Sequence, residues 1–134
     1  MAGSEIEIIL SRQLADCLSV PVFIVDPEGN LLFYNEPAEQ ILGKKYEDTG
    51  EMPVSQWSTM FTPRDKHGNL LPPEQLPLVK TLQKQKPAHG SFWIKSLDGN
   101  DYEISVTSYP IIGRAKVFSG AVAIFWMNSD QDEI

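Results

Sequence analysis

The segment PVFIVDPEGNLLFYNEPAEQILG constrains the fold of this chain more than any other. Two short apolar runs, Val22–Val25 and Leu31–Tyr34, flank Asp26–Asn30, a tight-turn sequence in which proline presets φ and glycine permits a positive φ. Asn35 stands where a helix N-cap belongs, and Gly43 is typical of the residue that ends a helix. The segment therefore predicts a strand, a turn, a second strand and a capped helix.

A helix precedes this segment and a helical crossover follows it. Apolar residues recur at helical spacing over Glu5–Leu18, which predicts an amphipathic helix with Cys17 as a small buried residue on it. After the capped helix we expect a loop over Lys44–Pro53 and one short helical turn over Val54–Phe61. A longer helix is predicted over Glu74–Gln85, because its internal proline falls in the first turn, where a missing N–H is tolerated.

Three strands complete the predicted domain. Gly90–Ser96 and Asp101–Tyr109 flank Asp98-Gly99, a hairpin turn sequence that tolerates positive φ. Val117–Met127, rich in Val, Ile, Phe and Trp, is predicted as the last strand. Two hairpin strands, a helical crossover and a three-stranded meander predict an α+β fold. We expect a five-stranded antiparallel sheet with short helices on one face, plus the N-terminal amphipathic helix.

This order of elements resembles that of a PAS domain, a small sensory and interaction module of signalling proteins. The resemblance covers roughly Leu14 to Asn128, and the residues that carry it are Asp26–Gly29, Asn35, Gly43, Asp98–Gly99 and Gly120. The end of the chain departs from the family. Many PAS domains finish with an Asp-Ile-Thr-like triplet, whereas this chain reads Trp-Met-Asn-Ser-Asp from Trp126 on, which leaves the route of signal output open.

Length and composition are those of one folded domain. The 134 residues are 42% hydrophobic, enough to bury a core. We expect residues 1–18 to hold a tag remnant and the amphipathic helix, residues 19–128 the PAS-like domain, and residues 129–134 an acidic disordered tail. The net charge of −7 argues against direct nucleic-acid binding. The single Cys17 fits a reducing compartment, hence a cytoplasmic location, and no apolar run is long enough for a membrane segment.

The cofactors known from PAS domains fit this chain poorly. Heme-binding members place an axial His on the helix before the third strand, but Glu74–Gln85 has none. We expect His67 to be exposed in a turn and His89 to take a hydrogen-bonded surface or edge position. Light-sensing flavin members use a Cys in an Asn-Cys-Arg-Phe-Leu type motif, and no Cys lies between Asn35 and Pro73. Heme on an axial His and cysteinyl-flavin chemistry are disfavoured, non-covalent flavin binding stays open, and we expect no metal site and no required cofactor.

Catalysis has little support in the sequence. There is no Gly-x-Ser-x-Gly elbow and no phosphate-binding glycine loop, so we predict that the chain is not an enzyme. The alternative is a small α+β enzyme, such as an isomerase that uses a pocket Asp and Tyr, for which Asp26 and Tyr34 are the candidates. We favour a turn role for Asp26, in which its carboxylate accepts hydrogen bonds from backbone amides.

The interior of the domain is the candidate site for a small hydrophobic ligand, because ligand pockets are mostly apolar with a few polar groups. The candidate lining residues are Phe23, Val25, Ile41, Trp57, Phe61, Leu76, Val79, Phe92, Ile94, Ile104 and Ile124. The alternative is that these residues simply fill the core. A register slip of one residue would also exchange Phe92 and Ile94 for Ser91 and Trp93.

The last predicted strand carries large apolar side chains on both faces, so both faces should be covered. The amphipathic helix is the expected cover for the outer face, from the same chain or from a partner. We therefore predict a homodimer. Its candidate interface residues are Ile6, Ile9, Leu10, Leu14, Phe118 and Trp126.

The sequence thus favours a PAS sensor or regulatory domain that dimerises and controls a linked effector. The resemblance implies a kinase, cyclase or transcription factor as that effector, in the same protein or in trans, as in two-component or transcription regulation. The first alternative is a PAS module used only for dimerisation or protein–protein interaction, with no ligand. The second is the isomerase-like enzyme.

Overall fold

The computed structural model of the protein describes residues 2–97 and 99–128, without the side chains of residues 2–7, 16 and 114. The expected turn residue Asp98 and the expected tail 129–134 lie outside the described residues. The helices are α1 (Ala2–Cys17), α2 (Glu36–Leu42), α3 (Tyr46–Thr49), α4 (Val54–Met60) and α5 (Pro77–Lys84), with short 3₁₀ turns η1 (Pro73–Gln75) and η2 (Arg114–Lys116). The strands are β1 (Val22–Val25), β2 (Leu31–Tyr34), β3 (Ala88–Lys95), β4 (Asp101–Ile112) and β5 (Phe118–Met127).

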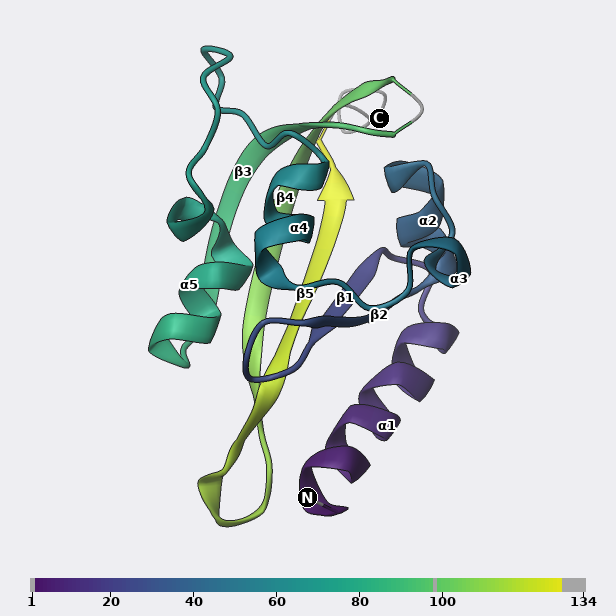
Figure 1. Ribbon diagram of the computed structural model, residues 1–134, viewed down its shortest axis with the longest axis vertical. Helices are drawn as coiled ribbons and strands as arrows, with labels where there is room; N and C mark the ends of the chain where they lie inside the picture. Colours follow the sequence, from purple (N-terminus) through teal and green to yellow (C-terminus); the bar gives the residue numbers. More distant parts are fainter. Residues whose placement is uncertain (1, 98, 129–134) are drawn as a thin grey trace.

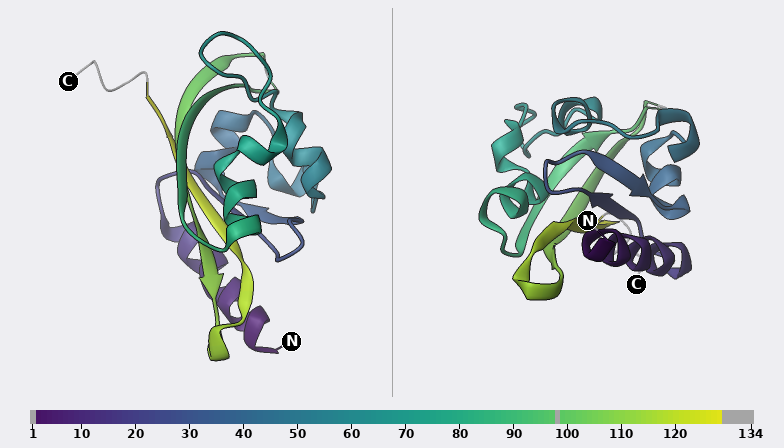
Figure 2. Two further views of the ribbon diagram at one scale, coloured as in Figure 1. Left: turned by 90° about the vertical axis from the view of Figure 1, so that its left-hand side faces the viewer. Right: turned by 60° about the horizontal axis from the view of Figure 1, so that its bottom comes forward.

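The five strands form one antiparallel sheet in the order β2-β1-β5-β4-β3, so the C-terminal strand lies at its centre. Helices α2 to α5 lie on one face of this sheet (Figure 1). Helix α1 lies on the other face, which the right-hand view of Figure 2 shows most clearly. The expected α+β fold, with short helices on one face and an N-terminal helix, is confirmed.

The first hairpin and the helix after it form as the sequence predicts. The Asp26 carboxylate accepts hydrogen bonds from the backbone N–H groups of Glu28 and Asn30, at 3.0 and 2.9 Å, and so closes the turn. Asn35 caps α2 by accepting a hydrogen bond from the Ala38 N–H at 3.3 Å. Gly43 ends the helix in the left-handed conformation, with φ of 81°. The turn between β1 and β2 therefore uses Asp26 as a structural group.

Two helical segments differ from the sequence prediction. The expected loop Lys44–Pro53 contains helix α3, and Met52 at its end forms an isolated β-bridge with Leu31. The expected helix Glu74–Gln85 is two pieces, η1 and α5, because Pro77 has no N–H to continue the first turn and instead begins a new helix.

Gly120 is required where β5 passes β1. Its φ is 141°, and a Cβ at this position would lie 2.3 Å from the carbonyl oxygen of Val25. Such a separation is far inside van der Waals contact, so only glycine allows the two strands to pair here. The Ile8 side chain of α1 also approaches this point, at 3.4 Å from the same hypothetical Cβ.

The alternation of side chains along β1 and β5 divides the interior into two cores. Phe23, Ala123 and Phe125 belong to the larger core, between the sheet and helices α2 to α5. Val22 and Val122, with Ile24 and Ile111, form a smaller core with Ala15 of α1 on the opposite face. Both faces of these strands are thus covered by the protein's own helices.

Helix α1 packs on the sheet with a different face from the one that the apolar pattern indicates. Ile8, Ala15 and Leu18 face the smaller core, whereas Ile9, Leu10 and Leu14 are 52%, 59% and 57% exposed. The prediction that Cys17 is buried was wrong, because it lies on the exposed side of the helix. The guanidinium of Arg12 lies over the Phe33 ring at 4.6 Å and holds α1 against β2.

Each edge strand of the sheet is partly paired with a non-strand segment. On one edge, Leu31 of β2 exchanges backbone hydrogen bonds with Met52. On the other, Trp93 of β3 exchanges two bonds of 2.8 Å with Arg64. The Lys95 N–H also donates to the Phe61 carbonyl at 2.7 Å.

Candidate functional site

A cavity of about 80 Å³ lies in the larger core, between the sheet and helices α2, α4 and α5, and is partly open to solvent. Trp57, Leu76 and Ile104 mark its three sides: α4, the start of α5 and the sheet. Its full lining is Phe23, Leu42, Trp57, Ser58, Phe61, Pro63, Leu76, Pro77, Leu78, Phe92, Ile94, Ile104, Val106, Ala123 and Phe125. Almost all of these side chains are apolar, so the cavity suits a hydrophobic group.

Two side chains in this lining carry polar atoms, and one of the two forms a hydrogen bond. The indole N–H of Trp57 donates to the Gly29 carbonyl at 2.7 Å, which fixes α4 against the β1–β2 turn. The Ser58 hydroxyl is buried and has no hydrogen-bond partner. Ser58 is therefore the polar group in the cavity wall that has its hydrogen-bonding capacity free.

Aromatic rings form one wall of the cavity. Phe23 stacks on Tyr34 with ring centroids 5.2 Å apart, and its ring meets Trp57 and Phe125 edge-on at 6.4 and 5.9 Å. The Tyr34 hydroxyl donates to the Lys44 carbonyl at 2.8 Å. Burial raises the pKa of Tyr34. These contacts hold Phe23 in a fixed orientation, so this wall is pre-formed.

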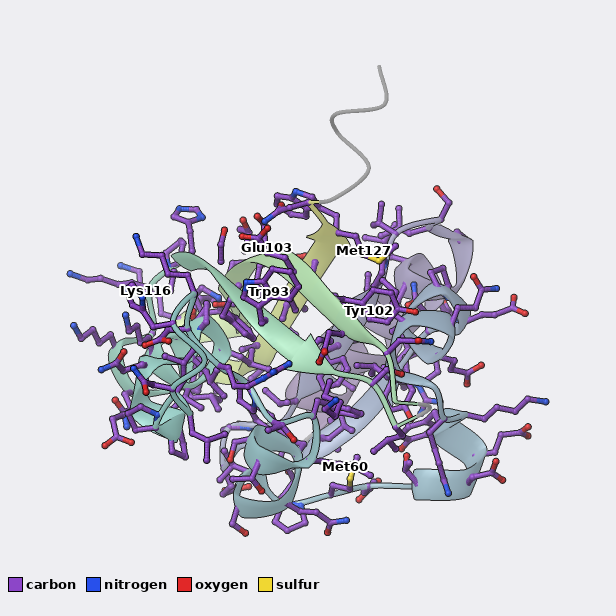
Figure 3. All side chains as sticks on the ribbon, turned by 90° about the horizontal axis from the view of Figure 1, so that it is seen from above. Met60, Trp93, Tyr102, Glu103, Lys116 and Met127 are labelled. Atoms are coloured by element: carbon purple, nitrogen blue, oxygen red, sulfur yellow. The ribbon has the colours of Figure 1, made fainter. Side chains whose placement is uncertain are left out.

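A strap, residues 62–71, connects the cavity to the edge of the sheet. Pro63 at its start lines the cavity, and the next residue, Arg64, pairs with Trp93 of β3. Arg64 also donates to the Asp101 carboxylate, and this hydrogen bond lowers the pKa of Asp101. Figure 3 shows Trp93 beside Glu103, its partner across β3 and β4, with Met60 apart from them in the helical layer.

Seven of the predicted pocket residues line the cavity: Phe23, Trp57, Phe61, Leu76, Phe92, Ile94 and Ile104. Val25, Ile41 and Val79 belong to the same core but do not line the cavity. Ile124 lies on the opposite face of β5, in the smaller core with α1. The strand is apolar on both faces, so the apolar pattern does not show which set of alternate residues faces the cavity.

The sequence prediction omitted several lining residues, including Ser58, Ala123 and Phe125. The positions 54, 57, 58 and 61 follow helical spacing, so the period that selected Trp57 and Phe61 also includes Ser58. Ala123 and Phe125 require the strand register, because Ala123 pairs with Phe23. In β3 the choice of face that the sequence left open is seen directly, since Phe92 and Ile94 line the cavity while Ser91 bonds Ser105 outside it.

The candidate dimer residues are spread over α1 and β5. The side chain of Ile6 is outside the described residues. Ile9, Leu10 and Leu14 are exposed on α1, and Trp126 on β5 is 40% exposed. Phe118 at the start of β5 is half-buried. The exposed residues leave an apolar surface on the side of α1 that faces away from the sheet.

The other candidate groups take structural positions. His67 is exposed in the strap, and His89 of β3 bonds Thr107 across the strands at 3.2 Å. No group of side chains suited to a metal ion occurs in the part of the chain that the structure describes. Over the same residues, none of the helices is long and apolar enough to cross a membrane.

A family model described as "PAS domain" matches residues 10–75 of the chain. Among solved structures, the PAS domain of a protein from Colwellia psychrerythraea superposes with a TM-score of 0.65 at 17% identity, over 92% of this chain and 98% of that one. The chain contains a PAS domain. The resemblance inferred from the sequence is thereby confirmed. No curated protein matches the chain at a significant level.

Two further structures share the PAS fold. The LOV protein of Rhodobacter sphaeroides is 13% identical over 95% of this chain and 73% of that one, with a TM-score of 0.71. The PAS domain of nitrogen regulation protein NR(II) from Vibrio parahaemolyticus is 15% identical over 88% of this chain and 97% of that one, with a TM-score of 0.58. At these identities the likeness concerns the fold alone, and PAS domains are typically sensor or signalling modules.

Proposed function

We propose that this PAS domain is a cytoplasmic, non-catalytic sensor of a signalling protein. In this proposal a small hydrophobic ligand occupies the inner cavity, two copies pair through α1, and occupancy of the cavity controls a linked effector such as a kinase, cyclase or transcription factor. The observation that carries the proposal is that the cavity and α1 lie on opposite faces of the same strands, β1 and β5.

The strands β1 and β5 supply the physical link between ligand and output. Phe23 and Ala123 line the cavity, and the adjacent residues Val22 and Val122 pack in the α1 core. Interiors are close-packed, so a side-chain shift on one face displaces the strand and the residues on its other face. A ligand that moves β5 therefore also changes the surface on which α1 packs.

The second candidate function is a PAS module for dimerisation alone. The size of the cavity favours it, because about 80 Å³ is well below the roughly 300–1,000 Å³ of typical ligand pockets. In this alternative the aromatic wall is core packing, and the exposed surface of α1 is the functional part.

Native mass spectrometry of the gently purified protein distinguishes the ligand-binding sensor from the module for dimerisation alone. We expect a bound small molecule, or uptake of added toluene, in the wild type, and loss of both in Ala123→Leu, which fills the cavity from the central strand. The matched control Val122→Leu adds volume on the α1 side and should leave uptake unchanged. A wild-type protein that carries no extra mass and takes up no toluene would support the dimerisation module.

A further inference from the structure

Ser58 stands out among the described residues as the buried side-chain polar atom without a hydrogen-bond partner. The residue is 2% exposed and belongs to α4, where it lines the cavity between Trp57 and Phe61. Buried polar groups in folded proteins are almost always paired, because a hydroxyl transferred from water loses its solvent hydrogen bonds. The unpaired hydroxyl therefore borders a cavity, where an occupant could satisfy it.

Neighbouring hydroxyls show that the fold otherwise supplies partners. The Thr59 hydroxyl, next along α4, donates to the Ser55 and Gln56 carbonyls at 3.2 and 3.3 Å. Between α5 and β4, Thr81 and Ser108 bond each other at 2.6 Å, and Ser108 also donates to the Pro77 carbonyl. Serine and threonine on helices commonly bond the carbonyl one turn back. Ser58 makes no such bond and instead borders the cavity.

We propose that Ser58 is the polar anchor for the cavity ligand, which is a small, largely apolar molecule carrying one hydroxyl or carbonyl group. The proposal rests on the cavity function proposed above. The apolar body contacts rings such as Phe23 and Phe61, and its single polar group exchanges a hydrogen bond with the Ser58 Oγ. A cavity of about 80 Å³ restricts the enclosed part to a few carbons or to one ring that the open side accommodates. A charged group is disfavoured inside, because none of the described residues that line the cavity is ionisable.

Phenol and toluene test this assignment, since they differ in shape only by a hydroxyl in place of a methyl group. Binding is followed by amide chemical shifts of lining residues such as Ile94 and Ala123. We expect the ratio of phenol affinity to toluene affinity to be about fivefold higher in wild type than in Ser58→Ala, equivalent to about 1 kcal/mol for one neutral hydrogen bond. Ser58→Cys, with its weaker hydrogen bonding, should give an intermediate ratio. The control Ser55→Ala, at an exposed position of α4, should keep the wild-type ratio.

The outcomes separate this proposal from the cavity function. If the probes bind but Ser58→Ala keeps the wild-type ratio of phenol to toluene affinity, the anchor is wrong and the cavity function stands. If neither probe binds, the cavity function fails and the anchor fails with it. The melting temperature of ligand-free Ser58→Ala gives a second readout. It should equal or exceed that of wild type, and a clear drop would show that the hydroxyl has a structural partner.

Discussion

At the scale of single residues, Asn35 joins more parts of the protein than any other side chain described. Its Oδ1 accepts hydrogen bonds from the Val22 and Ala38 N–H groups, at 2.9 and 3.3 Å. Its Nδ2 donates to the carbonyls of Ala15 and Val20, both at 2.9 Å. One buried amide thus connects the end of α1, the linker, β1 and α2.

We expect Asn35→Ala to destabilise the fold by about 3 kcal/mol. The variant loses a helix cap and leaves buried backbone groups unpaired, and each of these losses alone costs about 1–2 kcal/mol. For a domain of this size, that corresponds to a melting temperature lower by about 10 °C, measurable by circular dichroism. A change below about 2 °C would contradict this account.

Asn35→Asp separates the two functions of the side chain. The carboxylate keeps the acceptor that caps α2, but it places oxygen against the carbonyls of Ala15 and Val20. We therefore expect α2 amides to remain protected from hydrogen exchange in this variant, while amides at the end of α1 lose protection.

Residue roles were predictable where local sequence determines them. Asn35 as N-cap and Gly43 as helix end follow from neighbours within a few positions, and both are confirmed. The bonds from Asn35 to α1 were not predictable, because their partners lie 15 and 20 residues away. The exposure of Cys17 also depends on which face of its helix meets the sheet.

At the scale of elements, α1 has two apolar faces and covers the sheet with one of them. Ile8 and Ala15 pack on the sheet, and Leu10 and Leu14 point to solvent. A helix with apolar residues on both sides is typical of one packed between two surfaces. We propose that the second surface is the α1 of another copy.

Light scattering at tens of micromolar tests this pairing. We expect a dimer for wild type and a folded monomer for the double variant Leu10→Glu with Leu14→Glu, because two charges per helix would be buried against their counterparts. The control Gln56→Glu adds charge at an exposed polar position of α4, away from α1, and should remain dimeric. A wild-type monomer at this concentration would refute the interface.

Prediction of elements worked best where one strong pattern governs a segment. The strands and α4 follow their apolar periods closely. Helix α3 has only four residues, and its mostly polar sequence gives no apolar period that would predict a helix. Pro77 divides the predicted crossover helix because it has no N–H with which to continue the preceding helical turn. Which alternate residues of β5 face the cavity was not predictable, because both faces of the strand are apolar and only its pairing with β1 determines the orientation.

At the scale of the whole molecule, burial of tyrosines makes stability depend on alkaline pH. Burial raises the pKa values of Tyr34, Tyr46 and Tyr109 above their ordinary 10.0. Their contribution is complete below pH 10 and is lost as pH rises through the folded-state values, because the unfolded chain ionises first.

We therefore expect the tyrosines to leave the urea midpoint of unfolding unchanged up to about pH 10 and to lower it above that pH, at fixed ionic strength. Tyr34→Phe should lower stability at neutral pH, through loss of the bond to the Lys44 carbonyl, and should flatten the alkaline decline. An unchanged slope in this variant would mean that Tyr34 does not contribute to it.

The short bridges at the two edges of the sheet affect how the protein meets other chains. Leu31 of β2 is bonded to Met52, and Trp93 of β3 is bonded to Arg64. Exposed strand edges are templates on which another polypeptide can add a strand. Because some backbone groups on each edge are already bonded, an incoming strand would have to displace these bonds to pair along the whole edge. These bridges disfavour growth into an extended sheet, and the dimer proposed above uses the helical surface of α1 instead.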